Sequence, residues 1–188
     1  MTINAAVQTS DSASRARRRL RWLLAALVLV FLATSLRLFV FPSLPPSPPR
    51  VDAIIELGGP GDRDRVALEL ARAHRASYVV QSTTEKDARS NKCLPPVPEV
   101  TVLCFHADPY TTRGEAQSIQ RLAAEHGWKS VILVTTPDQA WRARLRVTRC
   151  FDGDVYVTTA ALPVLEYLWQ IPYQWVATLK AVTIETDC

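Results

Sequence analysis

The sequence has 188 residues and a formal net charge of +4, but the charge is unevenly placed along it. Residues 1–49 hold six arginines and one aspartate, a net of +5, whereas residues 50–188 hold 16 basic and 17 acidic side chains, a net of −1. The long C-terminal region therefore lacks the basic excess of a nucleic-acid-binding domain, and we expect no nucleic-acid partner.

The N-terminal region has the pattern of a membrane anchor. We expect residues 1–19 to form a disordered basic cytoplasmic tail and residues 20–41 to form a transmembrane signal anchor. The apolar run from Trp22 to Phe41 covers 20 positions, and a helix of that length spans about 30 Å, the thickness of a bilayer core. Its single charge, Arg37, lies near the outer end, where it can reach the headgroups.

The orientation of this anchor follows from its flanking charges. Arginines cluster between positions 15 and 21, and basic residues stay on the cytoplasmic side. We therefore expect a single pass through the cytoplasmic membrane, with the N-terminus inside and the domain outside. Ala33-Thr34-Ser35 resembles a cleavage site, so a cleaved signal peptide is the alternative.

Residues 42–50 form a Pro-rich linker. Five prolines between Pro42 and Pro49 favour polyproline II. Such a segment is stiff, and at ~3.1 Å per residue it would hold the domain roughly 25 Å from the membrane.

Residues 51–188 alternate between apolar runs and helical patterns, which predicts one α/β domain. Val51–Leu57 is followed by a glycine turn and a helix, and the same order recurs along the chain. The expected fold is a Rossmann-like, doubly wound, mainly parallel five-stranded sheet. The predicted strands are 51–57, 76–81, 100–105, the run from 131 and 154–158, and the predicted helices are 63–74, 112–126, 140–149 and 163–180; residues 82–98 are expected to be a loop.

Three turns follow the carboxyl ends of predicted strands, where open parallel sheets bind ligands. They run from Gly58 to Arg63, from Asp108 to Glu115 and from Thr135 to Arg142. Each has a structural alternative: a tight glycine turn, a helix cap at Thr112 and Glu115, or an amphipathic helix with solvated arginines. Arg144, Arg146 and Arg149 are expected to be solvated.

Catalytic motifs are sparse in the sequence. His106 is the only histidine predicted at the crevice, so His106 and Glu115 are the candidates for acid/base chemistry. The sequence has no GxSxG or HExxH motif and no CxxC spacing, so we expect neither a hydrolase triad nor a metal site or cofactor.

Four cysteines in a domain outside the membrane can form disulfides. Cys104 and Cys150 should lie at opposite edges of the sheet, roughly 17 Å apart, beyond the ~7 Å limit on the Cα separation. Cys93 lies on the loop that must return to the amino edge, so Cys93–Cys150 is the candidate disulfide. Cys104 is expected to be buried, and Cys188 is left unassigned.

The last predicted helix is aromatic, with Trp169, Tyr173 and Trp175. Two interpretations stay open. The helix covers a sheet face, or its aromatic residues contact the membrane surface or an envelope protein partner.

Several short motifs occur in a familiar order. Residues 52–59 (DAIIELGG), Arg65 with Ala67, 112–116 (TRGEA), and 134–136 (VTT) with 142–143 (RA) together resemble the ElyC/SanA/YdcF family over residues 51–158. The resemblance implies a membrane-anchored, Rossmann-like domain that serves cell-envelope biogenesis or integrity. From the three turns we expect a crevice for a phosphate-bearing or cell-wall-related ligand, lined by Gly58, Gly59, Arg65, Thr112, Glu115, Thr135, Gln139 and Arg142.

The chain departs from the family pattern at Gln139, where the family motif has a histidine. An amide does not titrate, so this position favours ligand binding over proton transfer. Two alternatives to a binding domain remain. One is a non-catalytic interaction module that docks to other envelope proteins, and the other is an enzyme acting on a lipid-linked phosphate with His106 or Glu115 as its base.

Overall fold

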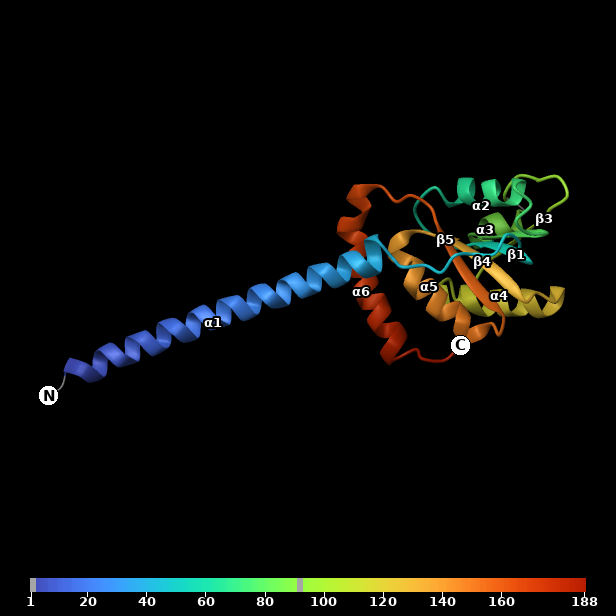
Figure 1. Ribbon diagram of the computed structural model, residues 1–188. Coiled ribbons are helices and arrows are strands. Elements are labelled where there is room, and N and C mark those ends of the chain that lie inside the picture. The colour runs from blue at the N-terminus through green and yellow to red at the C-terminus, as the bar shows by residue number, and fades with distance from the viewer. Residues whose placement is uncertain (1–2, 91–92) are drawn as a thin grey trace. The chain divides into compact units, whose positions relative to one another are not determined.

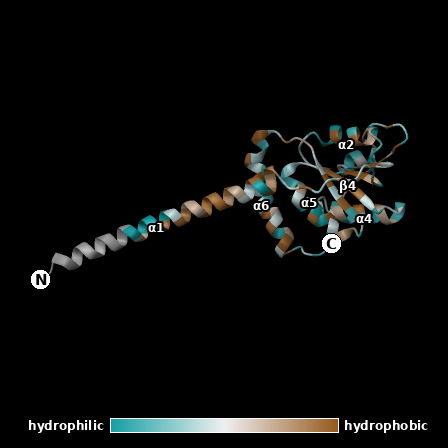
Figure 2. Cartoon of the chain, in the orientation of Figure 1, coloured by the Kyte–Doolittle hydropathy of each residue, from teal (hydrophilic) through white to brown (hydrophobic). Residues whose placement is uncertain are grey.

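The computed structural model describes residues 3–90 and 93–188, which divide into two units, residues 1–37 and 38–188. Helix α1 (Ile3–Ser35) runs without a break in the first unit (Figure 1), and the π-helical turn η1 (Leu36–Val40) follows it across the boundary between the two units. Residues 3–19, for which we expected disorder, are therefore helical. The stretch Arg15–Val40 is long and apolar enough to cross a membrane. In Figure 2, α1 has a teal, hydrophilic section that is followed by a mainly brown, hydrophobic one.

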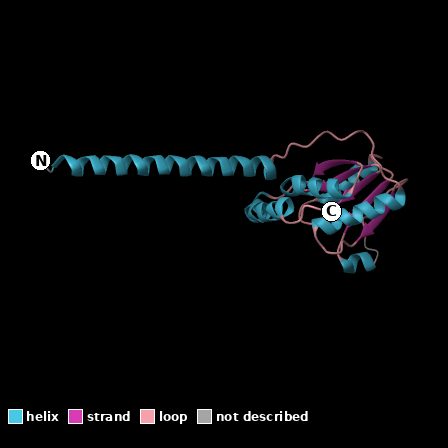
Figure 3. Ribbon diagram, turned by 90° about the horizontal axis from the view of Figure 1, so that it is seen from below, coloured by secondary structure: helices cyan, strands magenta, loops and turns pink. Residues whose placement is uncertain are grey.

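The second unit is built on one five-stranded sheet, all parallel, with the strand order β3-β2-β1-β4-β5 (Figure 3). The central strands β1 and β4 are buried on both faces because their residues are almost all aliphatic. The strands are β1 (Ala53–Glu56), β2 (Tyr78–Ser82), β3 (Thr101–Phe105), β4 (Ser130–Thr135) and β5 (Asp154–Thr159).

Helices cover both faces of this sheet. Side chains alternate between the faces of a strand, so Ile54 and Ile55 of β1 point into different cores. Helix α2 (Arg63–Arg72) packs on the Ile54 face, whereas α4 (Thr112–His126) and α5 (Pro137–Cys150) pack on the Ile55 face. Figure 1 shows α2 on one side of the sheet and α4 and α5 on the other.

The strand order creates a switch point between β1 and β4. From β1 the chain continues outward to β2 and β3, and it then crosses through α4 to β4 on the other side of β1. The loops that follow β1 and β4 consequently diverge to opposite faces and leave a crevice at the carboxyl edge.

Helix α4 begins and ends where the sequence predicts, whereas α5 begins at Pro137, three residues before its predicted start. Thr111 caps α4 by accepting a hydrogen bond from the Gly114 N–H (3.2 Å), and Gly127 ends that helix with φ 71°. Pro137 occupies the first turn of α5, where a missing N–H costs nothing. The final helix consists of a 3₁₀ turn, η2 (Val164–Glu166), and α6 (Tyr167–Thr183), which packs on α5.

The long loop after β2 is partly helical. A short helix, α3 (Glu85–Arg89), follows β2, and an isolated antiparallel bridge pairs Val97 with Val100 just before β3. Residues 91–92 of the expected loop lie outside the described residues.

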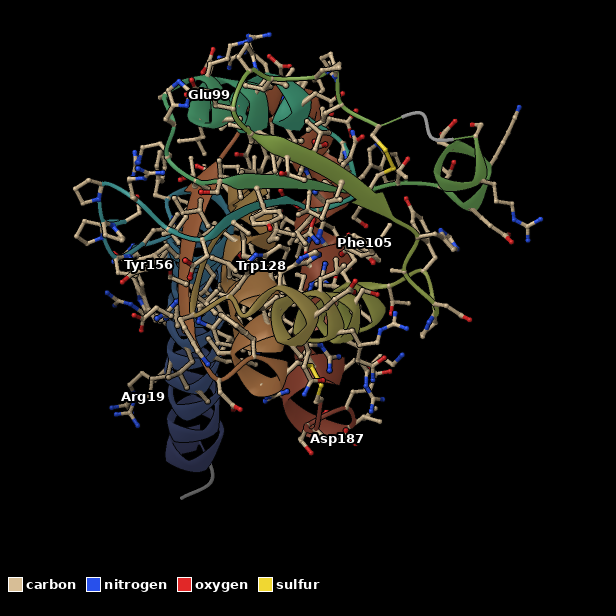
Figure 4. All side chains as sticks on the ribbon, turned by 90° about the vertical axis from the view of Figure 1, so that its right-hand side faces the viewer. Arg19, Glu99, Phe105, Trp128, Tyr156 and Asp187 are labelled. Atoms are coloured by element: carbon tan, nitrogen blue, oxygen red, sulfur yellow. A yellow bond between two sulfur atoms is a disulfide. The ribbon has the colours of Figure 1, made fainter. Side chains whose placement is uncertain are left out.

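The expected Cys93–Cys150 disulfide was wrong. The bridges are Cys93–Cys104 and Cys150–Cys188, seen as two yellow bonds in Figure 4. The loop turns back toward the amino edge only after Cys93, which therefore stays near the carboxyl end of β3, where Cys104 lies. Cys150 instead meets the C-terminal residue, which returns to the end of α5.

Arginines that we expected to be solvated hold this C-terminal tail. Arg146 is buried and ion-paired with Glu185, and Arg149 donates to the carbonyl oxygens of Ala181 (2.7 Å) and Glu185 (3.1 Å). These contacts, together with the Cys150–Cys188 bridge, fix the C-terminal end of α6 to α5.

The Pro-rich segment is not a free spacer. Leu44 packs against the main core, and Arg75 donates to the Ser47 Oγ (3.0 Å) and to the Pro48 carbonyl (2.6 Å). The segment lies on the surface of the folded domain, so it cannot hold that domain away from residues 38–41.

Glu56, the last residue of β1, is only 4% exposed. Burial, together with the neighbouring Asp64 carboxyl, raises the pKa of Glu56 to about 9. The side chain is therefore protonated in the folded protein at neutral pH, although it would ionise in the unfolded chain.

The raised pKa of Glu56 predicts how stability depends on pH. Between pH 4.5 and about 9 the folded state holds one proton more than the unfolded state, so stability falls as pH rises through this window. We expect Glu56→Gln to remove a slope of up to about 1.4 kcal/mol per pH unit in urea unfolding of the full chain. Glu125→Gln, at an exposed position of α4, should leave the slope unchanged. Equal slopes in Glu56→Gln and the unmodified chain would contradict the assignment.

Candidate functional site

A polar cavity of about 210 Å³ opens at the carboxyl edge of the sheet, at the switch point between β1 and β4. Six residues that we expected at the crevice line it: Gly58, Gly59, Thr112, Glu115, Gln139 and Arg142. The wall is completed by Pro60, Arg63, Tyr110, Thr111 and Asp138, and by Gln170, Tyr173 and Gln174 of α6.

Arg63 holds the glycine turn in place. Its Nη1 donates to the carbonyl oxygens of Leu57 (2.8 Å) and Gly58 (2.7 Å), and its Nε donates to the Pro60 carbonyl (2.9 Å). Its Nη2 donates to Thr136 Oγ1 (3.0 Å) and Gln139 Oε1 (3.1 Å). All five guanidinium N–H groups are used, so Arg63 brings positive charge to the cavity but no spare donor.

Arg142 is the second buried arginine of the cavity, and it is only partly bonded. Its Nε donates to Gln174 Oε1 (2.9 Å), its Nη1 donates to Thr112 Oγ1 (2.7 Å), and its guanidinium lies over the Tyr173 ring, 5.9 Å from the centroid. Its Nη2 has no hydrogen-bond partner within residues 3–90 and 93–188. Arg142 therefore presents unused donors in a cavity wall where it is 6% exposed.

Gln139 bridges the two arginines. Its Oε1 accepts from Arg63, and its Nε2 donates to Thr112 Oγ1 (3.2 Å), which also accepts from Arg142. The amide thus connects the first turns of α2, α4 and α5 and fixes their spacing. It does this without a group that titrates.

Glu115 lies under the glycine turn. Its Oε1 accepts a hydrogen bond from the Gly58 N–H (2.7 Å), so the side chain reaches across to the β1 turn instead of closing a capping box with Thr112. Burial raises the pKa of Glu115, while the Gly58 N–H, Arg63 and Arg142 oppose the rise. Glu115 is 5% exposed and faces the cavity.

Asp138 and Gln174 link α5 to α6. Gln174 Nε2 donates to Asp138 Oδ2 (2.8 Å), and Gln174 Oε1 accepts from Arg142, so one buried amide satisfies both neighbours. The other carboxylate oxygen, Asp138 Oδ1, is buried and has no partner among the described residues. A buried polar atom in this state indicates a place for water or a ligand.

The electrostatics of the cavity favour an anion. The helices α2, α4 and α5 begin at its wall, so their N-terminal partial positive charges meet there. The two buried guanidiniums of Arg63 and Arg142 add to this field, and the carboxyl groups of Glu115 and Asp138 oppose it.

Two residues expected at the crevice lie elsewhere. Arg65 is exposed and ion-paired with Asp62 (2.5 Å) and Glu69 (2.6 Å), because two residues along α2 from Arg63 the side chain points away from the sheet. Thr135, the last residue of β4, is fully buried beneath the cavity and does not line it.

His106 is not part of the cavity wall either. Its Nδ1 lies 3.1 Å from the Thr83 carbonyl oxygen, and its ring stacks on Tyr110 with the centroids 5.3 Å apart. Tyr110 lines the cavity and separates His106 from it. Of the two acid/base candidates, only Glu115 lines the cavity.

Sequence reasoning missed the contribution of α6. Gln174 lies more than 30 residues after Asp138 and Arg142, in a helix whose pattern is dominated by aromatic and aliphatic side chains. The available signal was a pair of glutamines, Gln170 and Gln174, one helical turn apart in a mainly apolar helix.

The described part of the chain contains no group of three or more His, Cys, Asp or Glu side chains able to hold a metal ion. Comparisons with protein-family models, with curated proteins and with solved structures found no match to this chain.

Gly59 gives a test of how the arginine network depends on the turn. Gly59 has φ 134°, and a Cβ there would lie 2.8 Å from Arg63 Nη2. We expect Gly59→Ala to destabilise the fold by about 1–3 kcal/mol, because it strains the backbone and displaces Arg63.

Gly127→Ala is the matched control, because Gly127 also has positive φ (71°) but has nothing within 4 Å of the added Cβ. It should lower the free energy of unfolding only through the strain of a positive φ, by about 1 kcal/mol. Urea unfolding of both variants measures the difference, and an equal loss of stability would mean that Arg63 does not constrain the turn.

Proposed function

We propose that residues 38–188 form a Rossmann-like, doubly wound domain of the ElyC/SanA/YdcF type that binds a phosphate-bearing or cell-wall-related anion. The domain lies outside the cytoplasmic membrane and serves cell-envelope biogenesis. The strand order, the helices on both faces and the cavity at the switch point support this fold assignment.

The unused donors of Arg142 are the observation that carries the proposal. A buried guanidinium with free N–H groups is costly unless a ligand or water pairs with it, and its planar fork matches the oxygens of phosphate or carboxylate. Thr112 and Gln174 fix the other side of the guanidinium and so orient Nη2.

Binding is favoured over proton transfer by the position of Gln139. At the centre of the network this amide accepts from one arginine and donates to Thr112, so its role is to set distances. The cavity volume of about 210 Å³ suits a phosphate group with a small part of the molecule that carries it.

Two observations support an outer location. The arginines before the apolar stretch predict that the N-terminus stays inside. All four cysteines are paired in disulfides, which persist in oxidising compartments and are rare in the cytosol.

Substitution of Arg142 tests anion binding directly. We expect the full chain in detergent to bind pyrophosphate, measured by calorimetry. Arg142→Gln should weaken binding at least about tenfold, because it removes a charge-assisted contact, and Arg142→Lys should restore part of it.

Arg144→Gln is the control, because it removes the same charge from an exposed position of the same helix. It should leave the affinity within about twofold. Thermal unfolding must show that Arg142→Lys is folded. Equal affinities for Arg142→Gln and Arg144→Gln would refute the proposed site.

An enzyme acting on a lipid-linked phosphate is the second candidate, and the position of Glu115 favours it. A buried carboxyl with a raised pKa beside anion-binding groups can donate a proton to a leaving oxygen. We expect Glu115→Gln to abolish any release of inorganic phosphate from pyrophosphate or a phosphate monoester while retaining binding. Turnover that survives in Glu115→Gln would rule out this role.

A further inference from the structure

Helix α6 has its polarity reversed compared with an ordinary surface helix. Its buried positions include the polar residues Gln174 and Thr178, which are 2% and 7% exposed. Its outer positions are apolar: Leu165, Leu168, Trp169, Val176 and Leu179 are each more than 60% exposed, and together with η2 they form one continuous stripe, which we call the outer stripe. A helix packed on a soluble domain normally shows the opposite pattern.

The charge of α6 is also unusual. From Tyr167 to Thr183 the only charged residue is Lys180, which pairs with Glu185 (2.7 Å). Surface helices that face water carry charges along the exposed face, whereas this face offers only aliphatic and aromatic groups. Brown segments along α6 in Figure 2 show the same property.

The end of the membrane-spanning stretch is attached to this helix. Phe39, near the C-terminal end of the stretch Arg15–Val40, is 1% exposed, and its ring packs edge-to-face against Trp175 of α6 with the centroids 5.4 Å apart. Both residues belong to the unit 38–188, and the Pro-rich segment after Phe41 lies on that unit instead of extending from it. Phe39 lies two residues after the end of the first unit, so α6 contacts the chain where the apolar stretch ends.

We propose that the outer stripe of α6 lies in the headgroup region of the membrane, so that the protein contacts lipid through α6 as well as through its spanning helix. Lipid is the partner that we assign to the outer stripe, because Phe39 attaches α6 to the end of the apolar stretch. An apolar face held at the bilayer surface meets lipid before it meets any other partner. Trp169 is of the residue type that favours this interface.

The arrangement gives α6 two roles on opposite faces. Its inner face supplies Gln170, Tyr173 and Gln174 to the cavity wall, while its outer face rests on lipid. The membrane surface therefore lies one helix away from the cavity.

Trp169, which is 80% exposed, provides the test. The full chain is reconstituted in phosphatidylcholine vesicles with bromine atoms on the upper acyl carbons, which quench only tryptophans in contact with lipid. We expect Trp169→Phe to remove a quenched component of the emission, and we expect the emission of Trp169 itself to fall about twofold in brominated vesicles.

Trp128→Phe is the control, because Trp128 is a core residue that is 4% exposed. Its loss should not change the quenched component. A charge on the outer stripe, Val176→Glu, should reduce the quenching of Trp169, whereas Thr148→Glu on an exposed part of α5 should not.

The proposal is overturned if wild type and Trp169→Phe show the same quenched component. Sedimentation in detergent then identifies what covers the stripe. If a second copy of the chain covers it, the protein sediments as a dimer that Val176→Glu dissociates, and if water covers it, the protein sediments as a monomer. Because the readout is independent of anion binding, its failure would leave the role of Arg142 intact.

Discussion

The cavity depends on Arg63, whose guanidinium lies inside the turn that follows β1. The carbonyl oxygens of Leu57, Gly58 and Pro60 converge on this side chain, and Thr136 and Gln139 bind its far side. Such a turn would otherwise bury several carbonyl groups without partners. By satisfying them, Arg63 holds the β1 turn against the β4 turn and fixes the width of the crevice. Arg142 can remain incompletely bonded because Arg63 carries out this structural task.

Much of the fold was predictable because local patterns and tertiary packing agree. Val131 to Val134 is an aliphatic run between a lysine-serine pair and a turn, and it forms most of the buried strand β4. Thr111 and Gly127 bound α4, because a threonine hydroxyl can cap a helix N-terminus and a glycine can adopt the left-handed conformation at its C-terminus. The rule that parallel sheets gather ligands at the carboxyl edge was enough to place Thr112, Glu115, Gln139 and Arg142 around one cavity.

The sequence alone could not show in which direction individual side chains point or where long segments turn back. Arg63 and Arg65 are equally basic and two positions apart, and only the path of the glycine turn decides which of them folds inward. The disulfides depend on where a long loop reverses and on where the C-terminal residue ends, and neither is encoded in local pattern. Gln174 joins the site by accepting a hydrogen bond from Arg142, although the two residues are 32 positions apart in the sequence. No short sequence motif can show a contact over that separation.

The Cys150–Cys188 bridge closes a covalent loop with a sequence separation of 38 residues, and this loop contains both β5 and α6. Closing a loop of this size restricts the unfolded chain by about 4 kcal/mol in the chain-entropy model. One wall of the cavity therefore belongs to a segment that cannot drift from α5 while the bridge is intact. In a thiol-reducing compartment that segment would be held only by noncovalent contacts, among them the pairing of β5 with β4, so the cavity wall that α6 supplies would be less firmly attached to α5.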